Sequence, residues 1–217
     1  MTIVLDEGRP LLLGSASPRR RDILASLGVP FVVRPAACDE SELPGEKPRA
    51  YLARVVADKR DAAAAIWAGS HERDRASRAP ALLVADTTVV LDGAMLAKPT
   101  GEADARAMLR ALSGRAHEVL TRFAVAKLPL RAARAPGVPR PREHAETVRT
   151  KVEFRALTRD EIARYAASGE GLDKAGAYAV QGRAAAFIAH ISGSYSGIMG
   201  LPMHETALLL RACGFLI

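Results

Sequence analysis

The chain has 217 residues, of which 49% are hydrophobic and 25% charged, and its mean hydropathy is +0.03. These values are ordinary for a globular protein with a sizeable core, and they favour one domain over residues 1–217. No apolar run reaches the ~18 residues that span a bilayer, and the start MTIVLDEGRPLLLG has no basic leader with a cleavage site, so we expect a cytoplasmic protein without a membrane role. The two cysteines, Cys38 and Cys213, are too few for a disulfide framework and are interpreted as reduced thiols.

The net charge of +7 is concentrated in one stretch of the chain. Between Arg122 and Arg155, nine basic residues stand against three acidic ones, which accounts for +6 of the +7. The middle of this stretch, residues 131–142, contains three prolines and a glycine without an apolar period, which predicts an exposed loop. A solvated loop is the simpler interpretation, and an arm that binds a polyanion such as nucleic acid stays open as the alternative.

Strand and helix signals alternate through the first half of the chain. Residues 11–14 (LLLG) predict a strand, and a helix is expected to begin at Pro18, behind Ser17 as N-cap, and to stop at Gly28. PFVVR then predicts a second strand. Residues 47–68 place apolar side chains at helical spacing and form the longest predicted helix, and a polar loop is expected at 70–80.

The second half predicts more strands and three further helices. ALLVADTTVVLDG gives two short β-rich runs around Asp86, and EADARAMLRALSG gives a short helix that ends at Gly114. HEVLTRFAVAKL and ETVRTKVEFRAL are expected to pair as a long hairpin around the basic loop. Helices are expected over RDEIARYAASGE, with Thr158 as N-cap, and over 202–213. The predicted class is α/β, with a mixed twisted sheet flanked by helices.

The stretch GSASPRRR, residues 14–21, carries the clearest chemical signal. Arg19 and Arg20 lie in the first turn of the predicted helix, where the positive end of the helix dipole disfavours cations. A bound anion resolves this conflict, because a helix N-terminus and two guanidinium groups together form a phosphate site. The plainer alternative is an exposed basic helix start. No Walker sequence GxxxxGK[ST] occurs in the chain.

Acidic residues supply a second signal. Asp86 interrupts an apolar, β-branched run, and a buried lone carboxylate costs several kcal/mol unless it is paired or coordinated. A metal ion, a hydrogen-bond network or a catalytic water would compensate it, whereas a strand-end aspartate in solvent needs no compensation. Asp39 and Glu40 follow the second predicted strand and place another carboxylate at the same sheet edge. Lys59 and Lys98 are ambiguous when taken singly.

The stretch DKAGAYAVQG, residues 173–182, passes from charged and small residues into a short β-like run. Gly176 allows close backbone approach, and Gln181 offers an amide that can donate to and accept from the edge of a base. The five histidines lack zinc-site spacing, and no GxSxG elbow marks a serine nucleophile.

Taken in order, these segments resemble the motifs of the Maf nucleotide pyrophosphatases. The matching stretches are GSASPRRRDILASLGVPF, YLARVVADK, VADTTVVLDGAMLAKPTGEADARAMLRALSGRAHEV, SGEGLDKAGAYAVQG and GSYSGIMGLPMHET. The resemblance implies an inosine-triphosphate-pyrophosphatase-like fold with a central cleft, a divalent metal such as Mg²⁺ or Mn²⁺, and hydrolysis of nucleoside triphosphates to the monophosphate and pyrophosphate. SASPRR and DKAGAYAVQG are more similar to the dTTP/UTP branch than to the 7-methyl-GTP branch. Segments 70–80 and 131–142 are longer than the family usually has.

The resemblance also implies roles for single residues. Asp86 would be the general base or a metal ligand, and Glu40 the assisting carboxylate and second ligand, although Asp39 and Glu42 are acidic alternatives to Glu40. Lys59 and Lys98 would hold phosphates and assist the chemistry. The remaining substrate-binding candidates are Ser17, Arg19, Arg20, Thr87, Lys174 and Gln181, of which Gln181 would contact the base.

Other functions stay open at this stage. Modified pyrimidine nucleotides are further candidate substrates of the dTTP/UTP activity, and a sister activity on 7-methyl-GTP or other modified nucleotides is the nearest alternative. A binding protein that uses the basic loop, and that resembles regulators of septum formation, is the alternative from another class. The oligomeric state, a homodimer included, is not fixed by the sequence.

Overall fold

The computed structural model describes residues 3–129 and 143–217, so the predicted basic loop at 131–142 lies outside the described residues. The strands are β1 Ile3–Val4, β2 Leu11–Leu13, β3 Phe31–Val33, β4 Ala81–Leu91, β5 Ala94–Leu96, β6 Ala116–Lys127, β7 Glu143–Phe154, β8 Ile188–Ser192 and β9 Phe215–Leu216. The helices are α1 Pro18–Ser26, α2 Pro48–Ala68, α3 Glu102–Leu112, α4 Arg159–Ala167, α5 Tyr195–Met199 and α6 Met203–Ala212. Short 3₁₀ helices occupy Arg75–Arg78, Ala175–Ala177 and Arg183–Phe187.

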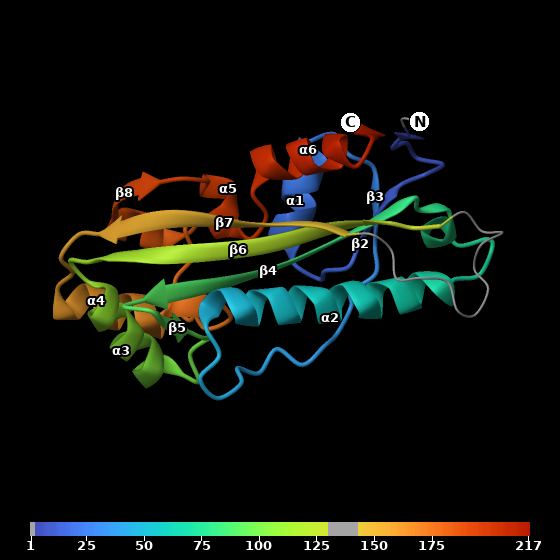
Figure 1. Cartoon of the computed structure of the whole chain (residues 1–217). Coiled ribbons are helices and arrows are strands. Elements are labelled where there is room, and N and C mark those ends of the chain that lie inside the picture. The colour runs from blue at the N-terminus through green and yellow to red at the C-terminus, as the bar shows by residue number, and fades with distance from the viewer. Residues whose placement is uncertain (1–2, 130–142) are drawn as a thin grey trace.

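A seven-stranded mixed sheet forms the frame of the molecule, in the order β3-β2-β4-β6-β7-β8 with β5 beside β4. β2 runs parallel to β3 and β4, whereas β4, β6, β7 and β8 alternate in direction. The three long strands β4, β6 and β7 cross the molecule from end to end (Figure 1). This confirms the predicted α/β class and the long hairpin of β6 and β7.

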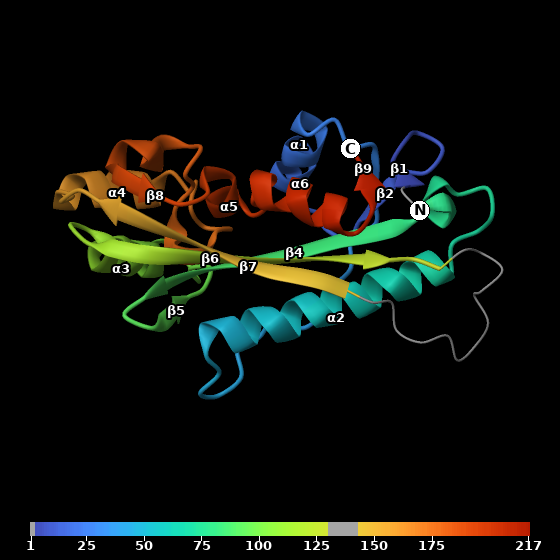
Figure 2. The same ribbon diagram turned by 45° about the horizontal axis from the view of Figure 1, so that its top comes forward.

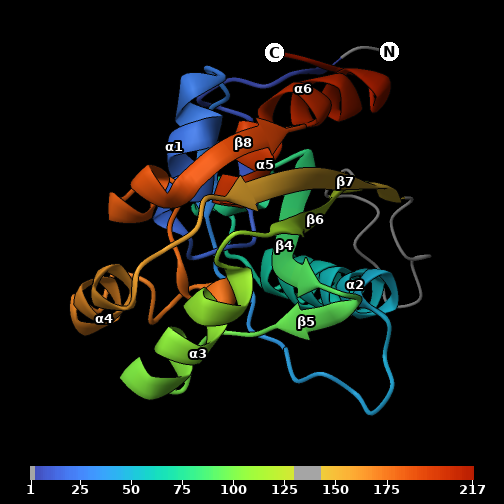
Figure 3. The same ribbon diagram turned by 90° about the vertical axis from the view of Figure 1, so that its left-hand side faces the viewer.

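Helices cover the sheet on both faces. α2 lies along one face, while α1 and α6 lie on the other (Figures 1 and 3). Alternate residues of β4 follow this division: Leu82 and Val84 pack in the cluster that includes Val56 and Trp67 of α2, and Leu83 and Ala85 pack with α1 and α6. A third cluster holds α3 and α4 against the far ends of β4, β6 and β7, at the opposite end of the molecule from both chain ends (Figure 2).

Several predicted element boundaries are confirmed. α1 begins at Pro18, and α4 has Thr158 as N-cap in a reciprocal capping box with Glu161. The prediction of two runs around Asp86 was wrong, because β4 continues unbroken through that residue. Part of the predicted loop at 70–80 is a 3₁₀ helix. Among the described residues, none of the helices combines the length and apolar composition that crossing a bilayer requires.

Candidate active site

An interruption in strand pairing lies beside the middle of β4. β6 pairs with one side of β4 from Ala81 to Val90, so β2 and β5 share the other side. β2 pairs only with Leu82 and Leu83, and β5 pairs only with Val89, Val90 and Leu91. Within the described part of the chain, the intervening backbone of β4 has no strand partner on that side. Asp86 sits in this interval, which leaves room for side chains from other elements to approach it.

Lys59 of α2 connects two carboxylates at this interval. Its Nζ lies 2.7 Å from Asp86 Oδ1 and 2.7 Å from Glu40 Oε1. Lys59 and Asp86 are only 6% and 8% exposed, whereas the Glu40 side chain is 43% exposed. Asp86 points to the α2 face of the sheet because it shares the alternation of Leu82 and Val84. The buried carboxylate therefore has a paired cation, and Glu40 lies between that pair and solvent.

The charges around Glu40 keep it ionised. Partial burial opposes ionisation, but the hydrogen bond and charge of Lys59, with the charges of Lys98 and Arg20, hold the pKa of Glu40 below its ordinary value. Lys98 itself is exposed, two residues beyond the end of β5. Two carboxylates and three cations from five separate segments thus act on one another here.

Arg20 reaches the same site from α1. Its Nε donates to the carbonyl of Gly200 at 2.8 Å, and its Nη1 donates to Ser15 Oγ at 2.9 Å. Burial lowers the pKa of the Arg20 guanidinium, while the negative charge of Asp86 acts in the opposite direction. Two hydrogen bonds to uncharged partners therefore orient the Arg20 guanidinium. Among the described residues, no carboxylate forms a hydrogen bond with it.

The first turn of α1 is arranged as the sequence predicts, with one difference. Ser17 occupies the N-cap position, but its side chain makes no capping hydrogen bond, and the first turn holds no acidic residue. Arg19 Nε donates to the carbonyl of Met199 at 3.2 Å. The hydroxyl of Ser17 and the positive end of the helix are therefore available to an anion.

Thr87 points to the opposite face of the sheet from Asp86. Its Oγ1 lies 2.8 Å from Thr121 Oγ1, and Thr121 Oγ1 donates to the carbonyl of Gly197 at 2.7 Å. A Cβ placed on Gly200 would lie 3.6 Å from Thr87 Oγ1 and 3.4 Å from Arg20 Nε. Thr87 therefore belongs to the Arg20 side of the site.

Fewer interactions connect the segment 173–182 with the charged residues of the site. Lys174 Nζ donates to the carbonyl of Glu170 at 3.1 Å and pairs with Asp173. The pKa of Asp173 is lowered chiefly by Lys174 and also by the charge of Arg19. Gln181 is exposed, and within residues 3–129 and 143–217 no hydrogen bond joins it to the charged cluster. The β-like run predicted here was wrong, since turns and 3₁₀ helices occupy this segment.

Sequence reasoning missed the groups that hold the predicted residues in place. Ser15 Oγ and the carbonyl of Gly200 orient Arg20, and Thr121 orients Thr87. Ser15 lies inside the GSASPRRR signal, so its neighbourhood was marked. Gly200 is 180 residues away from Arg20, and no local pattern reveals such a contact.

The cluster of paired carboxylates and cations, at the interruption beside β4 and near the N-terminus of α1, is the candidate active site of an α/β protein. The family model described as Maf-like protein matches residues 10–213. The chain belongs to this family.

The relatives are similar over nearly their whole length. A protein of Anaeromyxobacter dehalogenans (strain 2CP-1 / ATCC BAA-258) is 48% identical over 205 residues, covering 94% of each chain. One from Burkholderia thailandensis is 49% identical over 208 residues, covering 92% of this chain and 91% of the relative. One from Ralstonia nicotianae is 50% identical over 209 residues, covering 92% of each. All three are named dTTP/UTP pyrophosphatase.

Proposed function

We propose that the chain is a dTTP/UTP pyrophosphatase, a hydrolase that converts these nucleotides to the monophosphate and pyrophosphate. The observation that carries the proposal is Lys59, whose ammonium joins Asp86 and Glu40 at the interruption beside β4. The names of the relatives supply the substrate class. They do not favour a 7-methyl-GTP enzyme or a septum regulator that acts through its basic loop.

The charges of the site match a nucleoside triphosphate. Arg19, Arg20, Lys59 and Lys98 supply four positive charges, and Glu40 and Asp86 supply two negative ones, which leaves +2. A triphosphate carries roughly four negative charges near neutral pH. A divalent cation brought with the substrate closes this difference. The site therefore suits a metal–triphosphate complex better than the free anion.

Asp86 and Glu40 are the groups that would hold Mg²⁺ or Mn²⁺. Lys59 bonds to one oxygen of each carboxylate, and the second oxygen of each has no hydrogen bond within the described residues. No cluster of three or more histidine, cysteine or carboxylate side chains suited to a metal occurs there either. Mg²⁺ is normally held by one or two carboxylates completed by waters and substrate phosphates, so this donor set fits it. A bound metal would offset charge on the phosphoryl oxygens.

The protein's own groups divide the remaining work. Asp86 orients a water molecule toward the α-phosphorus and accepts its proton, with Glu40 assisting. Lys59 holds both carboxylates in place and keeps Glu40 ionised. Arg19, Arg20 and Lys98 grip the β- and γ-phosphates and stabilise the charge that builds on the leaving pyrophosphate.

The other substrate contacts follow from their positions. Ser17 donates its unused hydroxyl to a phosphate at the start of α1, with Thr87 on the Arg20 side of the site. Lys174 and Gln181 lie in the segment that would meet the nucleoside, with Gln181 reading the base edge. A site built around specific hydrogen bonds leaves polar groups unpaired with the wrong base, so CTP and GTP should be poorer substrates.

A nucleotide panel tests the proposal. Purified protein is incubated with dTTP, UTP, CTP, GTP and 7-methyl-GTP in the presence of Mg²⁺ or Mn²⁺, and phosphate and pyrophosphate are measured separately. We expect pyrophosphate from dTTP and UTP at the highest kcat/KM. Release of phosphate, or a clear preference for 7-methyl-GTP, would contradict the proposal. Binding of nucleic acid that weakens steeply with salt, without any hydrolysis, would favour the binding protein.

A further inference from the structure

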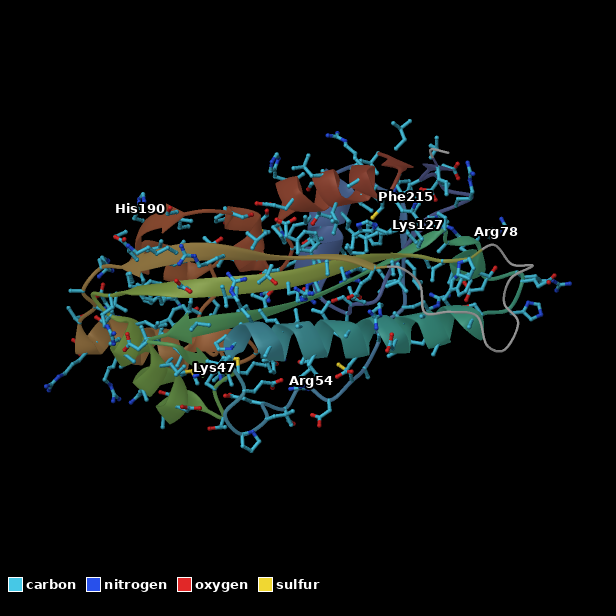
Figure 4. All side chains as sticks on the ribbon, in the orientation of Figure 1. Lys47, Arg54, Arg78, Lys127, His190 and Phe215 are labelled. Atoms are coloured by element: carbon cyan, nitrogen blue, oxygen red, sulfur yellow. The ribbon has the colours of Figure 1, made fainter. Side chains whose placement is uncertain are left out.

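Residues 34–47, between β3 and α2, contain no helix or strand, yet they carry Glu40 to the site. A carboxylate on such a segment is placed only as well as the backbone around it is held. Figure 4 shows Arg54 on the side of α2 along which this segment passes.

One face of α2 holds this segment by its backbone. Tyr51 Oη donates to the carbonyl of Glu40 at 3.1 Å, and Arg54 Nη2 donates to the carbonyl of Ser41 at 2.8 Å. Tyr51 and Arg54 are three residues apart and therefore neighbours on the helix surface. Lys59, further along the same helix, forms the ion pair with the Glu40 carboxylate.

Arg54 also makes a two-point ion pair with Glu46 at the end of the segment. Its Nε and Nη2 donate to the two oxygens of Glu46 at 2.9 and 2.7 Å. The side chains of Arg54 and Glu46 are 26% and 10% exposed, so solvent screens the pair less than an ordinary surface pair. The hydrogen bond from Arg54 lowers the pKa of Glu46, and Glu46 in turn accepts from the amide of Leu43 at 3.2 Å.

We propose that Arg54, together with Glu46, is a positioning residue for Glu40: it fixes the backbone of residues 40–46 on α2, so that the Glu40 carboxylate reaches Lys59. Among the described residues, no hydrogen bond or ion pair joins Arg54 or Glu46 to the side chains of the charged cluster, and neither residue touches substrate in this role. The inference rests on the proposed function, since it gives Glu40 a part in hydrolysis. A misplacement of about 1 Å costs on the order of 100-fold in rate when a reacting group must be oriented, so loosening this segment should be measurable.

A matched control lies at the other end of the same segment. Arg34 Nη2 donates to both carboxylate oxygens of Asp74, at 2.7 and 2.6 Å, and the two side chains are 36% and 27% exposed. This pair ties down residue 34 but does not touch Glu40 or its neighbours. Arg34→Met therefore removes another arginine–carboxylate ion pair of this segment without releasing the Glu40 backbone.

The test is a double-mutant cycle on UTP hydrolysis, with the variants Arg54→Met, Glu40→Gln and Arg54→Met/Glu40→Gln. Arg34→Met is the control. Arg54→Met should lower kcat about tenfold or more, whereas Arg34→Met should lower it by less than about threefold. The two variants should change Tm by similar amounts. In the Glu40→Gln background, Arg54→Met should cause little further loss, because the group it positions is already disabled. Arg54→Lys should recover part of the lost kcat.

The outcomes separate the two hypotheses. If Glu40→Gln keeps full kcat, the proposed role of Glu40 fails, and the positioning role fails with it. If Glu40→Gln is impaired but Arg54→Met lowers kcat equally in both backgrounds, Arg54 acts independently of Glu40 and the positioning role alone is overturned. Equal losses from Arg34→Met and Arg54→Met would also overturn it, since any anchor of the segment would then serve.

Discussion

His117 Nε2 and Tyr178 Oη lie 2.8 Å apart inside the core, joining β6 to the segment that carries Lys174 and Gln181. The His117 ring packs edge-on against Phe154 and Tyr178, and its Nδ1 is buried without a hydrogen-bond partner within the described residues. Burial lowers the pKa of His117 to about 4. The imidazole is therefore neutral in the folded protein at neutral pH.

This pair predicts a loss of stability in mild acid. The unfolded chain protonates His117 near pH 6.5, whereas the folded chain resists protonation down to about pH 4, so unfolding takes up a proton in between. The contribution of His117 to the free energy of unfolding is fully present above pH 6.5. It should fall by about 3 kcal/mol as the pH drops to 4. Urea unfolding at pH 7 and 4.5 measures the change. The other four histidines are exposed, and His117→Gln should remove most of the dependence. A slope unchanged in that variant would contradict the assignment.

Asp86→Asn should lower kcat by about 100-fold or more, because the amide keeps the shape of the side chain but cannot accept a proton or balance a metal ion. The fold should persist, since Glu40 still pairs with Lys59 at 2.7 Å. Steady-state hydrolysis of UTP and the far-ultraviolet spectrum measure both effects. Asp92→Asn, at an exposed carboxylate paired with Arg115, is the control and should keep normal kcat. A kcat of Asp86→Asn close to that of the unmodified protein would contradict the proposed role of Asp86.

Lys59→Met should move the acid limb of the kcat/KM profile to higher pH. Lys59 lowers the pKa of Glu40 by a hydrogen bond and by charge, so without it Glu40 becomes protonated at a higher pH. Lys98 acts by charge alone, and Lys98→Met should shift the limb in the same direction by less. Profiles recorded with saturating metal from pH 4 to 8 compare the two. A larger shift in Lys98→Met would reverse the order that the contacts impose.

Gly200→Ala should impair hydrolysis more than its effect on folding explains. Gly200 has φ +113°, and an added Cβ would lie 3.4 Å from Arg20 Nε, so both the backbone and the orientation of Arg20 would be disturbed. Gly93→Ala is the control, because Gly93 also has a positive φ (+82°) but nothing lies within 4 Å of its added Cβ. KM for UTP should rise in Gly200→Ala at a Tm that matches Gly93→Ala. Equal KM values would show that Arg20 keeps its position without Gly200.

The sequence predicted long and capped elements well, and interactions between distant residues poorly. The capping box at Thr158 and the proline start of α1 are local signals, and both are confirmed. The sequence predicted two runs where β4 is one strand, because a carboxylate in an apolar run is typical of the end of a strand. Its partner Lys59 is 27 residues away, so the compensation that lets the strand continue could not be seen.

Short elements escaped prediction for a related reason. β1 and β9 have two residues each and α5 has five, too few for a periodic pattern, and tertiary contacts hold them. The candidate residues themselves were found because family motifs mark them. The side chains that hold them, such as Ser15 and Arg54, form contacts that only the fold brings together.

The final prediction concerns the bond that breaks. UTP hydrolysed in water enriched in ¹⁸O should place the label in UMP, because the water oriented by Asp86 bonds to the α-phosphorus and pyrophosphate leaves as one unit. In the proposed arrangement the cations of α1 and Lys98 grip the β- and γ-phosphates, whereas Asp86 lies deeper, at 8% exposure, beside Lys59. Mass spectrometry of both products locates the label, and an α,β-methylene analogue of UTP should resist hydrolysis. Label in the pyrophosphate, or UDP as the first product, would place the attack at the β- or γ-phosphorus. The β- or the γ-phosphate, and not the α-phosphate, would then lie beside Asp86.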